Sequence, residues 1–95
     1  MAVQPLSCPG SRGNAVQLTN EFTTAAGVGH PRNTGGCPIF IDALDAAGRS
    51  LEQLLLEPGQ GQAWFSPPAG AASIWVVCSS QCTGHGELTY DTPVA

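Results

Sequence analysis

The chain has 95 residues, of which 42% are hydrophobic and only 11% are charged, and its formal net charge is −4. This length suits one domain with a single core, and so few charged residues beside 12 glycines and 8 prolines exclude a coiled coil or a long-helix bundle. Three arginines without a lysine cannot supply the positive surface that a phosphate backbone requires, and no apolar run reaches the length of a membrane span. We therefore expect one soluble β domain over residues 1–95, with neither nucleic acid nor membrane as a partner.

The opening segment, residues 1–14, is interrupted by Pro5, Pro9 and two glycines, and this punctuation predicts an irregular N-terminal arm. Its first ten residues lack the basic and apolar regions of a cleavable signal peptide. Four cysteines nevertheless favour an oxidising environment. A protein that is synthesised in the cytosol and later released from the cell would combine a missing signal-peptide pattern with an even number of cysteines. We therefore expect a virion or extracellular location after assembly or release.

Residues 15–23 alternate apolar and polar side chains, the period of a half-buried antiparallel strand. Residues 24–36 follow with four glycines and a proline. A long loop in a small domain is usually functional. We therefore expect residues 24–36 to form a Gly-rich loop that contacts a partner.

Residues 38–44 and 51–56 are separated by a short segment that contains Gly48, which predicts a β-hairpin. A short helix over residues 50–56 is the alternative, because a capping-box pattern opens this segment. Only about seven residues are available for that helix, and an isolated helix of that length is marginal. The strand is therefore favoured.

Three further strands are expected at residues 62–66, 73–79 and 87–92. Residues 73–79 are apolar on both faces, which is typical of a central strand. The chain is thus predicted to be all-β, a small antiparallel β-sandwich or barrel of about six short strands.

The four cysteines, Cys8, Cys37, Cys78 and Cys82, are candidates for two disulfides. The spacing favours a local Cys78–Cys82 bridge and a Cys8–Cys37 bridge that tethers the arm, while the other connectivities remain open. The cysteines could instead be free buried thiols, or Cys78, Cys82 and His85 with His30 could bind zinc, with Cys37 as another fourth ligand. Because the second half of a zinc-finger pattern is missing, disulfides are favoured and no cofactor is expected.

The sequence has neither a G-x-S-x-G nucleophile elbow nor a Gly-rich phosphate loop. We therefore expect a non-enzymatic structural or interaction module of a larger assembly, such as a protein that decorates or cements a virion capsid. The partners would be proteins, either further copies in a homo-oligomer or capsid-type subunits. The arm and the loop would supply the contact residues: His30, Pro31, Arg32, Asn33, Arg12 and Pro5.

Two alternatives belong to other functional classes. The first is a secreted or surface domain that binds carbohydrate or a protein ligand, with Trp64, Trp75 or Tyr90 as a sugar-stacking platform. The second is a metal-binding protein that uses the cysteine and histidine set described above.

Overall fold

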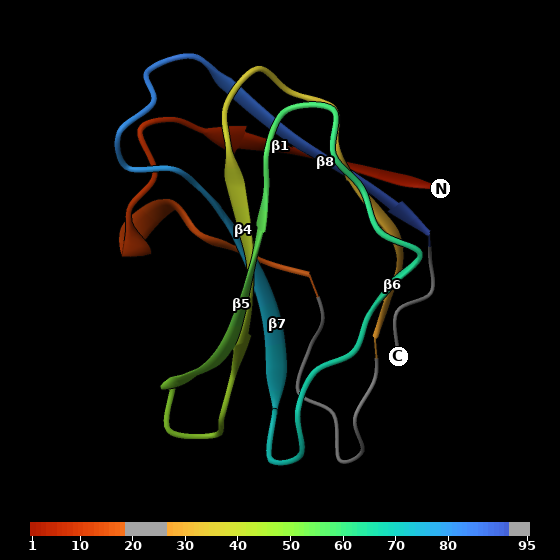
Figure 1. The fold of residues 1–95 in the computed structure, drawn as a ribbon. Coiled ribbons are helices and arrows are strands. Elements are labelled where there is room, and N and C mark those ends of the chain that lie inside the picture. The colour runs from red at the N-terminus through yellow and green to blue at the C-terminus, as the bar shows by residue number, and fades with distance from the viewer. Residues whose placement is uncertain (19–26, 92–95) are drawn as a thin grey trace.

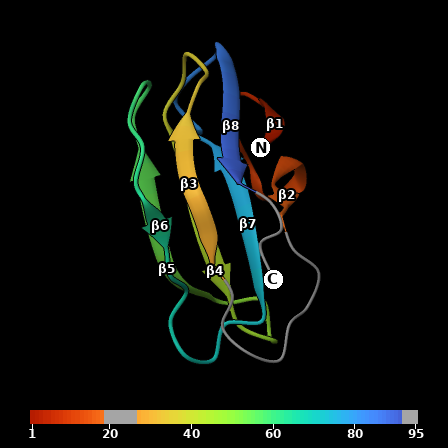
Figure 2. The same cartoon turned by 90° about the vertical axis from the view of Figure 1, so that its right-hand side faces the viewer.

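The computed structural model describes residues 1–18 and 27–91, except for the side chain of Arg12. Within these residues the chain forms two antiparallel sheets of four strands each, which pack face to face as a β-sandwich (Figures 1 and 2). The elements are β1 (Ala2–Ser7), a 3-10 helix η1 (Arg12–Asn14), β2 (Val16–Gln17), β3 (Val28–Asn33), β4 (Ile39–Leu44), β5 (Ser50–Leu56), β6 (Trp64–Phe65), β7 (Ser73–Cys78) and β8 (His85–Asp91). Sheet A has the order β1-β8-β3-β6, and sheet B has the order β2-β7-β4-β5. The all-β prediction is confirmed, and the architecture is a sandwich rather than a barrel.

The predicted hairpin is confirmed, because β4 and β5 pair antiparallel from Ile39 opposite Leu56 to Leu44 opposite Ser50. The alternative helix over residues 50–56 is not formed. Pairing along the whole of β4 satisfies the backbone groups of β5 that face β4 and places Leu56 in the core, whereas a two-turn helix would leave its first four amides without intrahelical partners. The strand expected at residues 73–79 is also confirmed as central, since β7 lies between β2 and β4.

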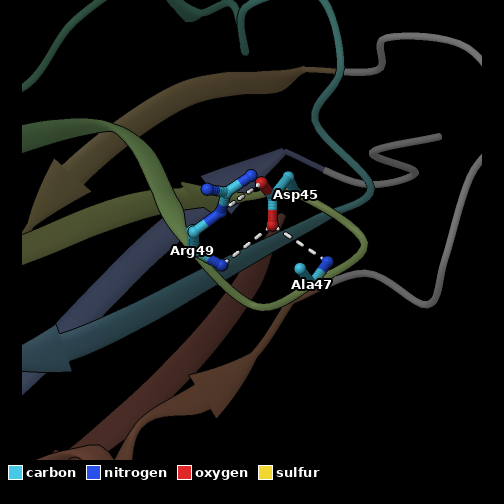
Figure 3. Close-up of polar contacts among 3 residues, drawn as sticks. All are labelled: Asp45, Ala47 and Arg49. Carbon is cyan, nitrogen blue, oxygen red and sulfur yellow. Dashed lines mark hydrogen bonds and ion pairs between the residues drawn. The ribbon is translucent and has the colours of Figure 1, made fainter.

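The β4–β5 turn shows how local sequence fixes the hairpin (Figure 3). Asp45 donates its N–H to the carbonyl of Arg49, and Gly48, with φ of +83°, closes the turn onto the carbonyl of Asp45. The Asp45 carboxylate accepts the N–H groups of Ala47 and Arg49, each at 2.9 Å. These bonds, first among them the backbone bond from Arg49, hold the pKa of Asp45 below its ordinary value of 3.8.

Two segments predicted to be irregular contain strands. The arm of residues 1–14 contributes β1, which pairs with β8, and Pro5 is tolerated there because β1 is an edge strand. The loop of residues 24–36 contributes β3, which lies between β8 and β6, while its residues 24–26 fall outside the described part of the chain. Both strands depend on ladder pairing with β8, which outweighs weak local propensity.

The core lies between the sheets and is filled by alternate residues of each strand. Its fully buried members include Val28, Ile39, Ile41, Ala43, Ile74, Val76 and Leu88. Leu88 and Tyr90 point inward from β8, with Glu87 and Asp91 on the opposite face. The alternation therefore also determines which side chains each sheet presents outward.

Candidate functional site

The four cysteines form two disulfides, so the disulfide prediction is confirmed, but the favoured pairing is wrong. Cys8 bonds Cys78, and Cys37 bonds Cys82. The pleat of β7 directs Cys78 into the core, where the end of β1 brings Cys8 beside it. Cys82, four residues further on, lies across from Cys37 instead. The pairing therefore follows from how the strands pack and not from spacing in the sequence.

The alternative zinc set is not assembled. All four sulfur atoms are bonded in disulfides and offer no thiolate to a metal. His85 opens β8, whereas His30 bonds Asp91 at the other end of that strand. A strand of this length separates its ends by about 20 Å, so these two histidines cannot share one ion.

The six predicted partner contacts fall into different environments. His30 and Arg32 are exposed on the outer face of sheet A, and Pro5 is exposed on β1. Pro31 and Asn33 are buried, so their prediction as partner contacts is wrong; the strand pleat turns them toward the core. The remaining residue, Arg12, lies in η1, and its side chain is outside what the structure describes.

Asn33 is a structural residue. Its side-chain amide donates to the carbonyls of Cys37 at 2.7 Å and Leu56 at 2.8 Å, while its oxygen accepts the N–H of Gly35 at 3.0 Å. Asn33 therefore ties β3 to the segments that open β4 and close β5. Only 1% of it is exposed, which leaves nothing for a partner to touch.

Over the central strands β8 and β3, the outward face of sheet A is polar, as is usual for the solvated side of an antiparallel sheet, while the exposed apolar side chains Val3 and Trp64 lie on its two edge strands. Thr34 donates to the carboxylate of Glu87 at 2.7 Å and lies 2.8 Å from the hydroxyl of Thr89. Arg32 is exposed on the same face. Sheet A thus requires no covering partner along these strands.

The outward face of sheet B is different, because apolar side chains cross three of its strands. Phe40 of β4 lies opposite Leu55 of β5 and Val77 of β7, which makes one apolar row. Leu44 and Trp75 extend it along β4 and β7. We call these five residues the apolar face. The sequence contained the signal for it, since apolar residues occupy both parities of residues 38–44 and 73–79.

A hollow of about 380 Å³ opens beside the apolar face. Its lining includes Trp75, Val77, Leu44 and a single carboxylate, Asp42. Asp42 accepts the Ser50 hydroxyl at 2.5 Å, which orients the carboxylate on the sheet surface. The hollow therefore combines an aromatic wall with one negative charge.

The three predicted sugar-stacking residues differ in exposure. Tyr90 is buried, so it is unavailable as a platform. Trp75 is half-buried and donates its indole N–H to Ser73 at 2.9 Å. Trp64 is 55% exposed on β6, one of the two edge strands of sheet A.

Comparison with known proteins identifies no relative: no protein-family model, curated protein or solved structure matches the chain. Among residues 1–18 and 27–91, no helix is long and apolar enough to cross a membrane. The fold and its cysteines define a small disulfide-bonded β-sandwich domain.

Proposed function

We propose that this protein is a non-enzymatic interaction module that holds a protein partner against the apolar face of sheet B. The observation that carries the proposal is the contrast between the two sheets. On sheet A the exposed apolar side chains, Val3 and Trp64, stand apart on opposite edge strands. On sheet B, Leu55, Phe40 and Val77 form one continuous row across three strands, in which Leu55 is exposed and the other two are half-buried. Contiguous exposed apolar surface on a small domain typically marks a binding surface. The edge strand β5 borders this face and offers a second mode of contact, strand addition.

The hollow indicates the chemistry of the partner. A lysine or arginine side chain can lie with its alkyl stem against Leu44 and Val77, its cation over Trp75, and its charge near Asp42. The net charge of −4 also favours a basic partner surface. We therefore propose a partner that inserts a basic side chain into an otherwise apolar contact.

The test begins with native mass spectrometry of the protein isolated from its source, which reports a stoichiometric partner or a homo-oligomer. Leu55→Glu then introduces a charge on the apolar face at a residue that is already 45% exposed. We expect binding to weaken at least about tenfold. Val3→Glu is the matched control, because Val3 is an exposed aliphatic residue on the other sheet's edge strand, 57% exposed, and should leave binding unchanged.

Asp42→Asn tests the basic contact, since it preserves shape and removes charge. The affinity should fall, and its dependence on salt should flatten. A protein that is monomeric and partner-free in its source material contradicts the proposal. Equal effects of Leu55→Glu and Val3→Glu contradict the assignment to sheet B.

Decoration or cementing of a virion capsid is the most specific form of this proposal. It is supported by the scarcity of charged residues, because a surface covered by neighbouring subunits needs fewer charges to stay in solution. Two disulfides are typical of proteins that function outside the reducing cytosol. The capsid proposal predicts that the protein co-sediments with assembled particles and that the Leu55→Glu variant stays in the supernatant. Wild-type protein that stays in the supernatant excludes the capsid but leaves the broader proposal open to the binding test.

A further inference from the structure

A slot lies on the outer face of sheet A, in the other sheet of the sandwich from the apolar face. The register places Gly29 of β3 opposite Asp91 of β8 on one side and opposite Trp64 of β6 on the other. Figure 2 shows these three strands side by side, in front of sheet B. A Cβ atom on Gly29 would lie 3.3 Å from the Cβ of Asp91 and 3.7 Å from the Trp64 ring. The glycine therefore forms the floor between a carboxylate and an indole.

The indole of Trp64 lies against the backbone of β3. A Cβ atom on Gly27 would approach the Trp64 ring to 2.0 Å, so only glycine allows the ring to rest there. Trp64 is nevertheless 55% exposed, although tryptophan is usually buried where it packs well. One part of the ring is thus anchored on the strand while the rest remains open to solvent, as in an aromatic platform.

His30 completes the slot by an unusual backbone conformation. The register of β3 shifts between Gly29 and Arg32, and His30 within this bulge has φ of +48°. This region is unfavourable for residues other than glycine, and such residues tend to occur at functional sites. The bulge brings His30 Nδ1 to 2.6 Å from the carboxylate of Asp91. In the neutral imidazole this contact places the proton on Nδ1 and leaves Nε2 as an acceptor.

We propose that Trp64, Gly29, Asp91 and His30 bind a neutral pyranose unit of a glycan. The apolar C–H face of a pyranose stacks on an exposed indole, and its hydroxyls donate to the Asp91 carboxylate and to His30 Nε2. An anionic sugar is disfavoured by Asp91 and by the net charge of −4. A hollow of about 380 Å³, lined by His30, Arg32, Gln62 and their neighbours, gives room for the next sugar of the chain.

The test follows the two indole N–H signals in ¹⁵N-correlated NMR spectra, assigned with Trp64→Phe. The probes are methyl β-glucoside, methyl β-galactoside, methyl α-mannoside and methyl N-acetyl-β-glucosaminide, with methyl β-glucuronide as the anionic arm. At least one neutral glycoside should shift the Trp64 signal with a millimolar Kd while the Trp75 signal stays fixed. Trp64→Ala should abolish binding, and Asp91→Asn should weaken it at least about tenfold.

Gly29→Ala tests the floor of the slot with the smallest possible side chain: its methyl group would lie 3.3 Å from the Cβ of Asp91, a tight contact that a shift of a few tenths of an ångström in the Asp91 side chain relieves, and 3.7 Å from the Trp64 ring. The variant should keep the wild-type spectrum outside the slot, which shows that it is folded, and should lose affinity. Three results overturn the proposal: no neutral glycoside shifts the Trp64 signal, binding persists in Trp64→Ala, or the glucuronide binds as well as the neutral probes. None of these results bears on the apolar face, which Leu55→Glu tests separately.

Discussion

Removal of the buried amide of Asn33 should be among the most damaging single changes in this protein. Asn33→Ala leaves three buried or half-buried groups without their present partners: the carbonyls of Cys37 and Leu56 and the N–H of Gly35. A protein hydrogen bond contributes about 1 kcal/mol net, so we expect a loss of about 3 kcal/mol. For a domain of this size each kcal/mol lowers Tm by about 4–8 °C, which gives a fall of about 12–24 °C.

Differential scanning calorimetry and urea unfolding with intact disulfides measure this loss. Thr34→Ala is the control, because Thr34 is the next residue and also makes two side-chain hydrogen bonds, but on the exposed face of sheet A. Exposed substitutions usually change stability by no more than about 0.5 kcal/mol. If the two variants lose similar stability, burial is not what makes Asn33 important and the reasoning fails.

Asn33→Asp keeps the size of the side chain and so separates the loss of hydrogen-bond donation from the loss of packing at this position. The ionised carboxylate can only accept, so it would face two carbonyl oxygens that now receive N–H groups. The protonated carboxyl recovers one donor. We therefore expect Asn33→Asp to be less stable relative to wild type at pH 7 than at pH 4. A pH-independent difference would show that lost packing, not lost donation, dominates.

Two further predictions concern the cross-links and the β4–β5 turn. Replacing both Cys37 and Cys82 with serine should lower the free energy of unfolding by about 4 kcal/mol, because this bridge closes a loop with a sequence separation of 45. Chemical unfolding measures the loss, and a value below about 1 kcal/mol would contradict the loop-entropy argument. The carboxylate of Asp45 has its pKa lowered by hydrogen bonds from Arg49 and Ala47, so its contribution is complete above its ordinary value of 3.8 and is lost as the pH falls through the folded-state value. The free energy of unfolding of Asp45→Asn should therefore decrease less than that of the wild type as the pH falls below about 4. The same dependence of this free energy on pH in both proteins would refute the prediction.

The sequence was sufficient to predict those strands whose signal lies within a few consecutive residues. Alternation in β4 puts Ile39 and Ile41 on one face, which is the buried one, and the apolar run of β7 predicted a central strand. The hairpin turn could also be predicted from the sequence, since an Asx turn at Asp45 and a glycine at positive φ are properties of a few consecutive residues. The candidate tryptophans were also visible, but nothing in the sequence separates exposed Trp64 from half-buried Trp75.

The amino-acid sequence by itself thus determined the fold class, the hairpin and the presence of disulfides, because these depend on short-range pattern and composition. The tertiary structure decided that residues 2–7 and 28–33 are strands, since their prolines and glycines weaken local propensity and ladder pairing overcomes it, with β8 for both segments and also with β6 for residues 28–33. It also decided that Cys8 meets Cys78 and that Phe40, Leu55 and Val77 come together in one row on the outer face of sheet B. Disulfide partners and exposed faces depend on which strands lie next to each other, and that arrangement is fixed by long-range packing of the whole chain.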